Sequence, residues 1–273
     1  MTDDPRTWDD TVLRSALDAH PDLRWGPIAV IPSTGSTNAD AADQVHEGAP
    51  EGFVVVADEQ TAGRGRLDRT WTSPSGAGLA MSLVLRPVVS DRAWGWLPLI
   101  AGVATVDALR GLGVPAVLTW PNDVMVDGPA HDGGPGPRKL GGILAERVGE
   151  AVVVGIGINT DLGRDELPVG RATSTRLEGA AVRREELCVA ILDRLRGLYQ
   201  TWQLADGDAA RAGTGQRYAE RCLMVGRAVR ASLPGGEVLE GTAVRIGDDG
   251  SLVVEAADGT QRAVSAGDVL LVR

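Results

Sequence analysis

The chain has little cysteine, few aromatic residues and no long apolar run. Two cysteines in 273 residues are too few for a disulfide framework. No apolar stretch approaches the roughly 20 residues that a membrane-spanning helix needs, and residues 1–10 carry no signal-peptide pattern. The chain also has fewer basic than acidic residues: 27 Lys and Arg against 37 Asp and Glu, which gives a net charge of −10. This balance disfavours non-specific binding to nucleic acid or to an anionic membrane, and we expect a cytoplasmic protein.

Apolar residues are abundant enough to form a sizeable core. Hydrophobic residues make up 43% of the chain and charged residues 23%, which is the balance of a globular protein. The length suits one large domain or two ordinary ones. The 36 glycines indicate many tight turns or places where the backbone approaches a ligand closely.

Hydrophobic periodicity predicts strands and helices over most of the chain. Strands are predicted at residues 29–32, 52–58, 79–86, 114–119, 124–127, 142–146 and 151–158. Helices are predicted at 11–19, 39–47, 97–112 and 185–202. Residues 128–137 are predicted to form a mobile Gly/Pro-rich hairpin loop, and 207–215 a linker. From residue 225 onward, short alternating segments separated by turns predict a small all-β barrel of about 50 residues.

Residues 58–71 (DEQTAGRGRLDRTW) follow a predicted strand and alternate two glycines with two arginines. Glycine lets the backbone fold closely over a bound group, and guanidinium groups match carboxylate and phosphate oxygens with paired donors. The segment is not a Walker A loop and lacks the third glycine of a dinucleotide fingerprint. Taken alone, it is equally compatible with a solvated basic turn or an RNA-binding Arg-Gly stretch.

Three further segments carry residue types that suit an anion or metal site. Asn122 and Asp123, at a strand end, could hold Mg²⁺ or a ribose, or form an ordinary turn. Lys139 enters a strand after a loop, where it could neutralise a phosphate or discourage edge-to-edge pairing. Residues 155–159 (GIGIN) form a glycine-softened strand, which indicates a close ligand approach or a β-bulge.

Together and in this order, these segments closely resemble the biotin protein ligases. That family has an STN turn, a QTAGRGR-x-x-R-x-W-x-S-P loop, a KWPND segment, a K-L-x-G-I-L strand and a G-x-G-x-N strand. The corresponding residues here are 36–38, 60–74, 120–123, 139–144 and 155–159. The resemblance is strong from about residue 31 to 159. It is weaker from 225 to 273, where the family carries an SH3-like barrel.

The resemblance implies an α+β fold. A mixed β-sheet catalytic domain flanked by helices, of the class II synthetase-like biotin/lipoate ligase type, would precede a small C-terminal SH3-like β-barrel. The implied boundaries are an N-terminal extension at 1–27, a catalytic biotin- and ATP-binding domain at 28–222 and the β domain at 223–273. Because only about 30 residues precede the catalytic domain, the chain resembles the short form of the family, without a DNA-binding domain.

The implied activity is that of a carbon–nitrogen bond-forming ligase. It would activate biotin as biotinyl-5′-AMP with ATP and Mg²⁺, and transfer it to a lysine of the biotin carboxyl carrier domain of a carboxylase. No DNA or membrane partner is expected, and a homodimer is compatible with the family. Two alternatives stay open: a lipoate-protein ligase of the same fold, and a nucleic-acid-binding regulator that uses the arginine-rich loop.

The resemblance also assigns site residues. Lys139 and Arg66 would be catalytic, offsetting the repulsion between biotin carboxylate and triphosphate, and Asp123 is the candidate Mg²⁺ ligand. The implied biotin-binding residues are Ser36, Thr37, Asn38, Gln60, Gly63, Arg64, Gly65, Arg66, Lys139, Gly142, Gly155 and Gly157. The implied ATP-binding residues are Arg69, Trp71, Asn122, Asp123, Lys139 and Asn159.

The chain departs from the family pattern at two positions that bear on the site. Thr119 stands where the family usually has the lysine before WPND, and Asp68 replaces a common glycine. We expect the Thr119 side chain near the nucleotide end of the site, with a core-facing side chain as the alternative. The loops at 63–69 and 128–137 are predicted to be mobile without ligand, and the first is predicted to order over biotin.

Overall fold

The computed structural model describes residues 8–18, 25–67, 69–72, 74–233, 235–265 and 267–272. Asp68 lies outside these ranges, and so does Ala19, the last residue of the first predicted helix. The α-helices are α1 (Asp10–Asp18), α2 (Thr37–His46), α3 (Leu97–Gly111), α4 (Arg184–Leu204) and α5 (Thr214–Arg221). Two 3₁₀ turns, Asp91–Trp96 and Arg164–Glu166, precede α3 and follow the last strand of the larger sheet.

Seven strands form the larger sheet, in the order β1-β2-β3-β7-β6-β5-β4. They are β1 (Ile28–Thr34), β2 (Val54–Gln60), β3 (Gly78–Leu85), β4 (Ala116–Thr119), β5 (Asp123–Val126), β6 (Arg138–Val148) and β7 (Ala151–Asn159). Strands β1 and β2 are parallel, and every other neighbouring pair in this sheet is antiparallel. The sheet is therefore mixed, as expected for an α+β fold.

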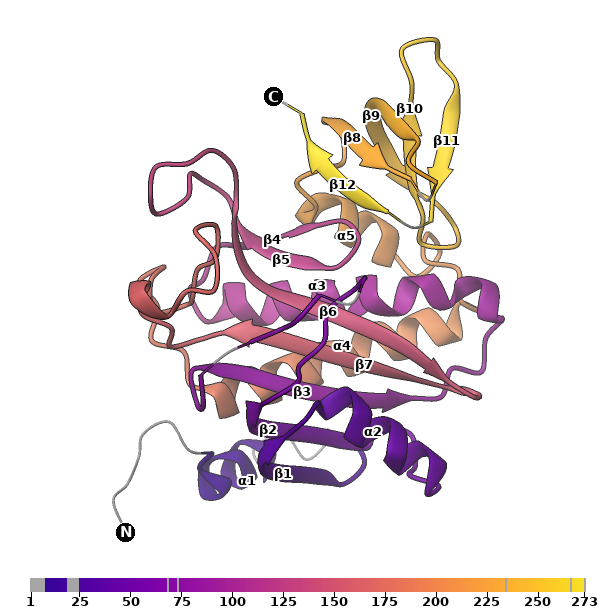
Figure 1. Ribbon diagram of the computed structural model, residues 1–273. Coiled ribbons are helices and arrows are strands. Elements are labelled where there is room, and N and C mark those ends of the chain that lie inside the picture. Colours follow the sequence, from indigo (N-terminus) through magenta and orange to yellow (C-terminus); the bar gives the residue numbers. More distant parts are fainter. Residues whose placement is uncertain are drawn as a thin grey trace.

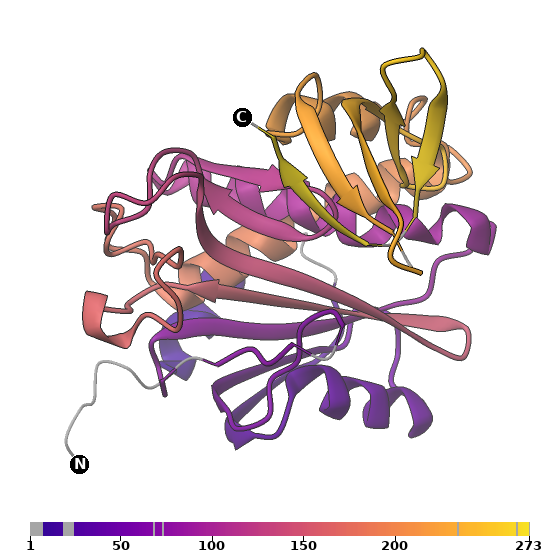
Figure 2. The ribbon, with the colours of Figure 1, turned by 45° about the horizontal axis from the view of Figure 1, so that its top comes forward.

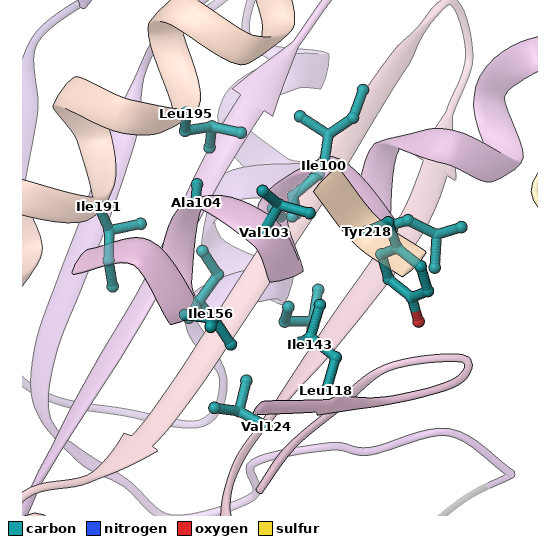
Figure 3. Close-up of a cluster of buried hydrophobic side chains, with 14 of the residues drawn as sticks. Ile100, Val103, Ala104, Leu118, Val124, Ile143, Ile156, Ile191, Leu195 and Tyr218 are labelled. Carbon is teal, nitrogen blue, oxygen red and sulfur yellow. The ribbon is translucent and has the colours of Figure 1, made fainter. Parts of the chain in front are cut away.

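The main core lies between one face of this sheet and helices α3 and α4. Helix α3 is apolar on nearly every side, because it packs against both the sheet and α4. Figure 3 shows Ile100 and Val103 of α3 and Ile191 and Leu195 of α4 above Ile156 of β7, all in the buried cluster. This layer fixes the sheet whose opposite face carries the candidate site.

Helix α2 covers part of the opposite face. A second, smaller core joins Ala41 of α2 to Val55, Val84 and Val153 of three strands. Ser36 precedes the helix in extended backbone, at the N-cap position where serine is favoured. Figure 1 shows the segment that follows β2 crossing in front of β6 and β7 beside α2. The space between this segment and the sheet becomes the candidate site.

The C-terminal residues form a separate antiparallel sheet in the order β11-β10-β9-β8-β12. Its strands are β8 (Ala228–Ser232), β9 (Val238–Ile246), β10 (Leu252–Glu255), β11 (Gln261–Val264) and β12 (Asp268–Leu271). This sheet sits against the start of α3 and the β4–β5 hairpin, as Figure 2 shows. The indole N–H groups of Trp96 and Trp120 donate to the carbonyls of Asp248 (3.0 Å) and Gly250 (3.0 Å). These bonds attach the C-terminal sheet to the site-bearing part of the chain.

Two elements differ from the sequence-based predictions. Helix α5 was not predicted and begins at Thr214, inside the predicted linker at 207–215, and β6 begins at Arg138 rather than at Gly142. Because β6 starts earlier than predicted, Lys139 lies inside this strand, where it pairs with Met125 of β5. No helix within the described ranges is both long enough and apolar enough to cross a membrane.

Candidate active site

A cavity of about 230 Å³ lies between the sheet, the start of α2 and the segment after β2. Every site residue predicted from the sequence lines it except Gly63. The predicted residues on its walls are Ser36, Thr37, Asn38, Gln60, Arg64, Gly65, Arg66, Arg69, Trp71, Asn122, Asp123, Lys139, Gly142, Gly155, Gly157 and Asn159. Positions up to 123 residues apart in sequence therefore meet at one site.

Two glycines of β7 create the floor of the cavity. Side chains alternate across a strand, so Val154, Ile156 and Ile158 enter the main core while Gly155 and Gly157 face the cavity. A Cβ at Gly155 would lie 2.2 Å from Asn38 Oδ1, and one at Gly157 would lie 2.8 Å from the Trp71 ring. Only glycine lets these two side chains approach the strand so closely.

Gly63 lies in the loop and does not line the cavity. Its carbonyl accepts a hydrogen bond from the Trp71 N–H at 2.8 Å, which closes the segment between them. A Cβ at Gly63 would lie 2.5 Å from the Trp71 carbonyl oxygen. The predicted contact between Gly63 and biotin therefore has no cavity surface to support it, and the glycine is needed for the turn.

A buried polar network occupies the α2 end of the cavity. Gln60 Oε1 accepts hydrogen bonds from the Thr37 N–H (2.9 Å) and from Thr37 Oγ1 (3.0 Å). Ser82 Oγ lies 2.7 Å from Thr37 Oγ1 and 2.6 Å from Asn38 Oδ1, and Ser82 is fully buried. The network fixes the rotamers of Thr37, Asn38 and Gln60 before any ligand binds. Sequence reasoning missed Ser82, although a lone serine in the apolar strand LAMSLVL was a visible signal.

Glu146 of β6 joins this network to the arginine-rich loop. Its Oε2 accepts hydrogen bonds from Asn38 Nδ2 (2.6 Å) and from Arg64 Nη2 (3.2 Å). The Arg64 side chain is half exposed, so this ion pair contributes no more than about 1 kcal/mol. The contact orients the loop without closing it permanently.

The opposite end of the cavity carries charge. Lys139 Nζ donates to Asp123 Oδ1 at 2.6 Å, and both side chains are about one third exposed. Asn122 Nδ2 donates to the Ile143 carbonyl at 2.8 Å, and a cis peptide bond joins Trp120 to Pro121 just before it. Lys139 can exchange its carboxylate partner for a ligand oxygen, because water already reaches the pair.

Two groups on the cavity wall have unused hydrogen-bonding capacity. Asn159 is buried and its Nδ2 donates to the Thr173 carbonyl at 3.0 Å, but its Oδ1 has no partner among the described residues. The guanidinium of Arg66 likewise makes no hydrogen bond or ion pair to any described residue. Burial lowers the pKa of Arg66, and the charges of Asp268 and Asp123 oppose that shift. An arginine stays charged at neutral pH, so the cavity holds a cation and an acceptor for a ligand.

Arg69 points to the C-terminal sheet rather than only to the cavity. Its guanidinium pairs with Asp268 at the start of β12, so the loop and the C-terminal sheet are linked beside the site. The sequence contained no signal for this long-range pair. The predicted nucleotide contact of Arg69 would require this exposed pair to open.

No cluster of three or more His, Cys, Asp or Glu side chains in the described part of the chain could hold a metal ion alone. Asp123 offers one carboxylate on the cavity wall. Magnesium is commonly bound through one or two carboxylates together with substrate phosphates and water. The donor set therefore fits a Mg²⁺ ion that arrives with a nucleotide.

Thr119 does not lie on the cavity wall. It is 7% exposed at the end of β4, which favours the core-facing alternative over the expected position near the nucleotide. We therefore expect Thr119→Lys to lower the free energy of unfolding by at least about 2 kcal/mol, because it buries an unpaired ammonium group. Thermal unfolding combined with the KM for ATP tests this. A stable variant with a lower KM for ATP would contradict it.

Comparisons with known proteins agree with the arrangement of the chain. The family model described as "Biotin/lipoate A/B protein ligase family" matches residues 28–162, and "Biotin protein ligase C terminal domain" matches 225–272. The chain is 37% identical to the biotin–[acetyl-CoA-carboxylase] ligase of Mycobacterium tuberculosis, over 91% of this chain and 90% of that protein. It is 34% identical to the enzyme of that name from Paracoccus denitrificans, over 84% and 94%.

Solved structures show the same fold. The biotin protein ligase of Aquifex aeolicus in complex with biotin and ATP superposes with a TM-score of 0.70 at 24% identity, covering 90% of this chain and 98% of that one. The ligase of Leishmania major in complex with biotinyl-5-AMP gives a TM-score of 0.58 at 28% identity, covering 88% and 98%.

Proposed function

The chain belongs to the biotin/lipoate A/B protein ligase family, and we propose that its cavity activates biotin with ATP and transfers it to a lysine of a biotin carboxyl carrier domain. The chain is a ligase with a biotin protein ligase fold. The observation that carries the proposal is one cavity with two different ends. A rigid, neutral polar network suits the ureido ring of biotin, and the end with Lys139 and Arg66 suits anions.

In the first half-reaction, the biotin carboxylate attacks the α-phosphorus of ATP. A carboxylate–phosphate bond forms, the bond to the β-phosphate oxygen breaks, and pyrophosphate leaves. Both reactants are anions, so catalysis depends mainly on cations placed where negative charge gathers. Lys139 would leave Asp123 to contact the α-phosphate and the carboxylate, and Arg66 would contact the same charge from the loop.

Asn159 and Asn122 would bind the nucleotide beside this centre. The unpartnered Asn159 Oδ1 accepts a hydrogen bond, which suits a ribose hydroxyl group. Trp71 would pack against the bound adenylate from the loop side. Asp123, once released by Lys139, would be free to hold Mg²⁺, which neutralises phosphate charge when it is bound.

The product of the first step is a mixed anhydride, which water hydrolyses readily. The glycines of the GRGR segment allow the loop to cover the cavity, and exclusion of water is the expected role of such closure. The loop is already attached at both sides, through Arg64 to Glu146 and through Arg69 to Asp268. We predict that bound ligand orders this loop further.

In the second half-reaction, the acceptor lysine amine attacks the carbonyl carbon of the mixed anhydride. An amide bond forms, the bond to the phosphate oxygen breaks, AMP leaves and the amine proton passes to solvent. No enzyme nucleophile is needed for this step. Burial raises the pKa of the Cys188 thiol to about 12, so this cysteine is a core residue and not a nucleophile.

The test is incubation of the protein with ATP, Mg²⁺, biotin and a carrier domain, followed by intact-mass measurement of the carrier. We expect the carrier mass to rise by one biotinyl group, and only when ATP is present. A parallel sample with lipoate in place of biotin distinguishes the alternative ligase. Modification by lipoate alone would replace the biotin assignment.

Two further properties are part of the proposal. We propose that the enzyme is cytoplasmic and that a homodimer is compatible with its activity. Fractionation of cells and sedimentation of the purified protein test these properties separately from activity.

A further inference from the structure

A buried carboxylate lies behind the nucleotide end of the cavity without lining it. The Glu178 side chain is 8% exposed and accepts hydrogen bonds from Arg138 Nε (2.7 Å) and Arg138 Nη2 (2.7 Å). Its Oε1 also accepts a hydrogen bond from Thr173 Oγ1 at 2.6 Å. Neither the sequence motifs nor the proposed reaction uses Glu178.

The partners of Glu178 are attached to two residues of the site. Arg138 directly precedes Lys139 in β6. The Thr173 N–H donates to the Lys139 carbonyl at 2.8 Å, and the Thr173 carbonyl accepts the hydrogen bond from Asn159 Nδ2 at 3.0 Å. The Lys139 N–H in turn donates to the Arg171 carbonyl at 2.6 Å. The backbone of Lys139 and the amide of Asn159 are therefore both held by the segment at 171–173.

The hairpin loop at 128–137 joins the same cluster. His131 Nε2 lies 2.8 Å from Thr173 Oγ1, whose single hydrogen points to Glu178. His131 Nε2 must therefore donate to that oxygen. Arg138 Nη1 also donates to the Pro129 carbonyl. One carboxylate thus ties together the loop, the start of β6 and the segment at 171–173.

The charge state of the cluster supports a permanent ion pair. Burial raises the pKa of Glu178, but hydrogen bonds from Arg138 and Thr173 and the nearby positive charges outweigh this, so the net shift is downward. The pKa of Arg138 is raised, first through its hydrogen bonds to Glu178. A buried pair with satisfied hydrogen bonds is rigid, and removing one partner leaves the other charge buried and unpaired.

We propose that Glu178 is a positioning residue for the nucleotide half of the reaction, which holds Lys139 through Arg138 and Asn159 through Thr173. This inference rests on the proposed function of the cavity. The two ends of the site have separate hydrogen-bond networks. No hydrogen bond between described residues joins the network of Thr37, Gln60 and Ser82 to the Glu178 cluster. Loss of Glu178 should therefore change ATP handling far more than biotin binding, because Lys139 would contact only the carboxylate of biotin and the network of Thr37, Gln60 and Ser82 would hold the ureido ring.

The decisive variant is Glu178→Gln, compared with Asp107→Asn as a matched control. Asp107 forms a similar two-bond pair with Arg221, at 2.6 Å and 3.2 Å, with side chains 21% and 17% exposed. Neither of these residues lines the cavity. We expect Glu178→Gln to raise the KM for ATP about tenfold, because small misplacements of a catalytic group have effects of this order. The Kd for biotin alone should stay within about twofold of wild type.

A second readout does not depend on catalysis. Lys139 is the only lysine of the chain, so reductive ¹³C-methylation labels Lys139 and the N-terminal amine alone. We expect Glu178→Gln to shift the Lys139 methyl signal, and Asp107→Asn to leave it in place. If Glu178→Gln fails to fold, Thr173→Val carries the test, with a change of about threefold in the KM for ATP in the same direction.

Three outcomes would overturn the inference. These are an unchanged KM for ATP with an unchanged Lys139 signal, an equal loss of biotin affinity in Glu178→Gln, or the same pattern in Asp107→Asn. A wild-type protein without adenylate formation would instead refute the proposed function. The methyl signal separates the two failures, because it is measured without substrate turnover.

Discussion

Replacing Lys139 with alanine is expected to slow pyrophosphate release by about 10²- to 10³-fold. Removal of one preorganised donor at a charge-developing centre typically has an effect of this size, about 2.7–4 kcal/mol. Lys139 Nζ lies at the charged end of the cavity, and among the described residues its one side-chain partner is Asp123, at 2.6 Å. Its ammonium group can therefore contact the α-phosphate when the biotin carboxylate attacks.

The fold should tolerate this change. The ion pair of Lys139 with Asp123 is about one third exposed, so its loss should change the free energy of unfolding by no more than about 1 kcal/mol. Arg147→Ala is the matched control, because Arg147 lies at the other end of β6 and pairs with Asp91 on the surface. We expect wild-type rates in that control. A folded Lys139→Ala protein with a normal rate would exclude Lys139 from the chemistry.

Lys139→Arg separates charge from geometry. Arginine keeps the positive charge but presents a wider, planar group on a different stem. We expect it to recover part of the rate lost in Lys139→Ala. A full recovery would show that charge alone is sufficient at this position, and no recovery would show that the compact ammonium group is required.

The strongly periodic elements could be predicted from the sequence because their signal is local. Helix α4 repeats its apolar residues at helical spacing, and the strands before it are runs of β-branched residues. Helix α5 has no such signal. Its one large apolar residue is Tyr218, which packs edge-on against Trp96 with ring centroids 6.3 Å apart. Tertiary contacts, rather than its own pattern, stabilise this helix.

The start of β6 also could not be predicted from the local sequence pattern. Glycines at 141 and 142 weaken the apolar pattern, so the strand was predicted to start only at Gly142. In the structure it starts at Arg138, because Arg138 pairs with Val126 of β5 and Lys139 pairs with Ala172. These partners are distant in sequence, so a local sequence pattern does not predict the pairing.

The residues of the candidate site likewise fall into those that could be predicted from the sequence and those that could not. Residues in contiguous motifs, such as those of the GRGR loop, could be predicted because each motif has a recognisable order. Glu146 and Glu178 could not be, because each is a single polar residue without a motif, and the one signal for Ser82 was its place in an apolar strand. Their role comes from partners contributed by other strands and loops. Residues that orient a site are therefore the ones that short sequence patterns miss.

The second large effect concerns Gly155, and we expect Gly155→Ala to weaken biotin binding by about 10²-fold. The new Cβ would lie 2.2 Å from Asn38 Oδ1. Asn38 cannot move aside easily, since Ser82 and Glu146 hold its amide at 2.6 Å each. The strain must spread into the network that shapes the neutral end of the cavity. Calorimetric titration with biotin, without ATP, measures the effect.

The same strain should lower stability by about 1–3 kcal/mol, as overpacking of a tight interior does. Gly197→Ala is the control, because a Cβ on that helical glycine of α4 meets no atom within 4 Å. It should leave biotin binding unchanged and add up to about 1 kcal/mol of stability. Adding Asn38→Ala to Gly155→Ala removes the colliding group, so the double variant should regain stability without regaining affinity. Wild-type biotin affinity in a folded Gly155→Ala protein would show that biotin does not occupy this end of the cavity.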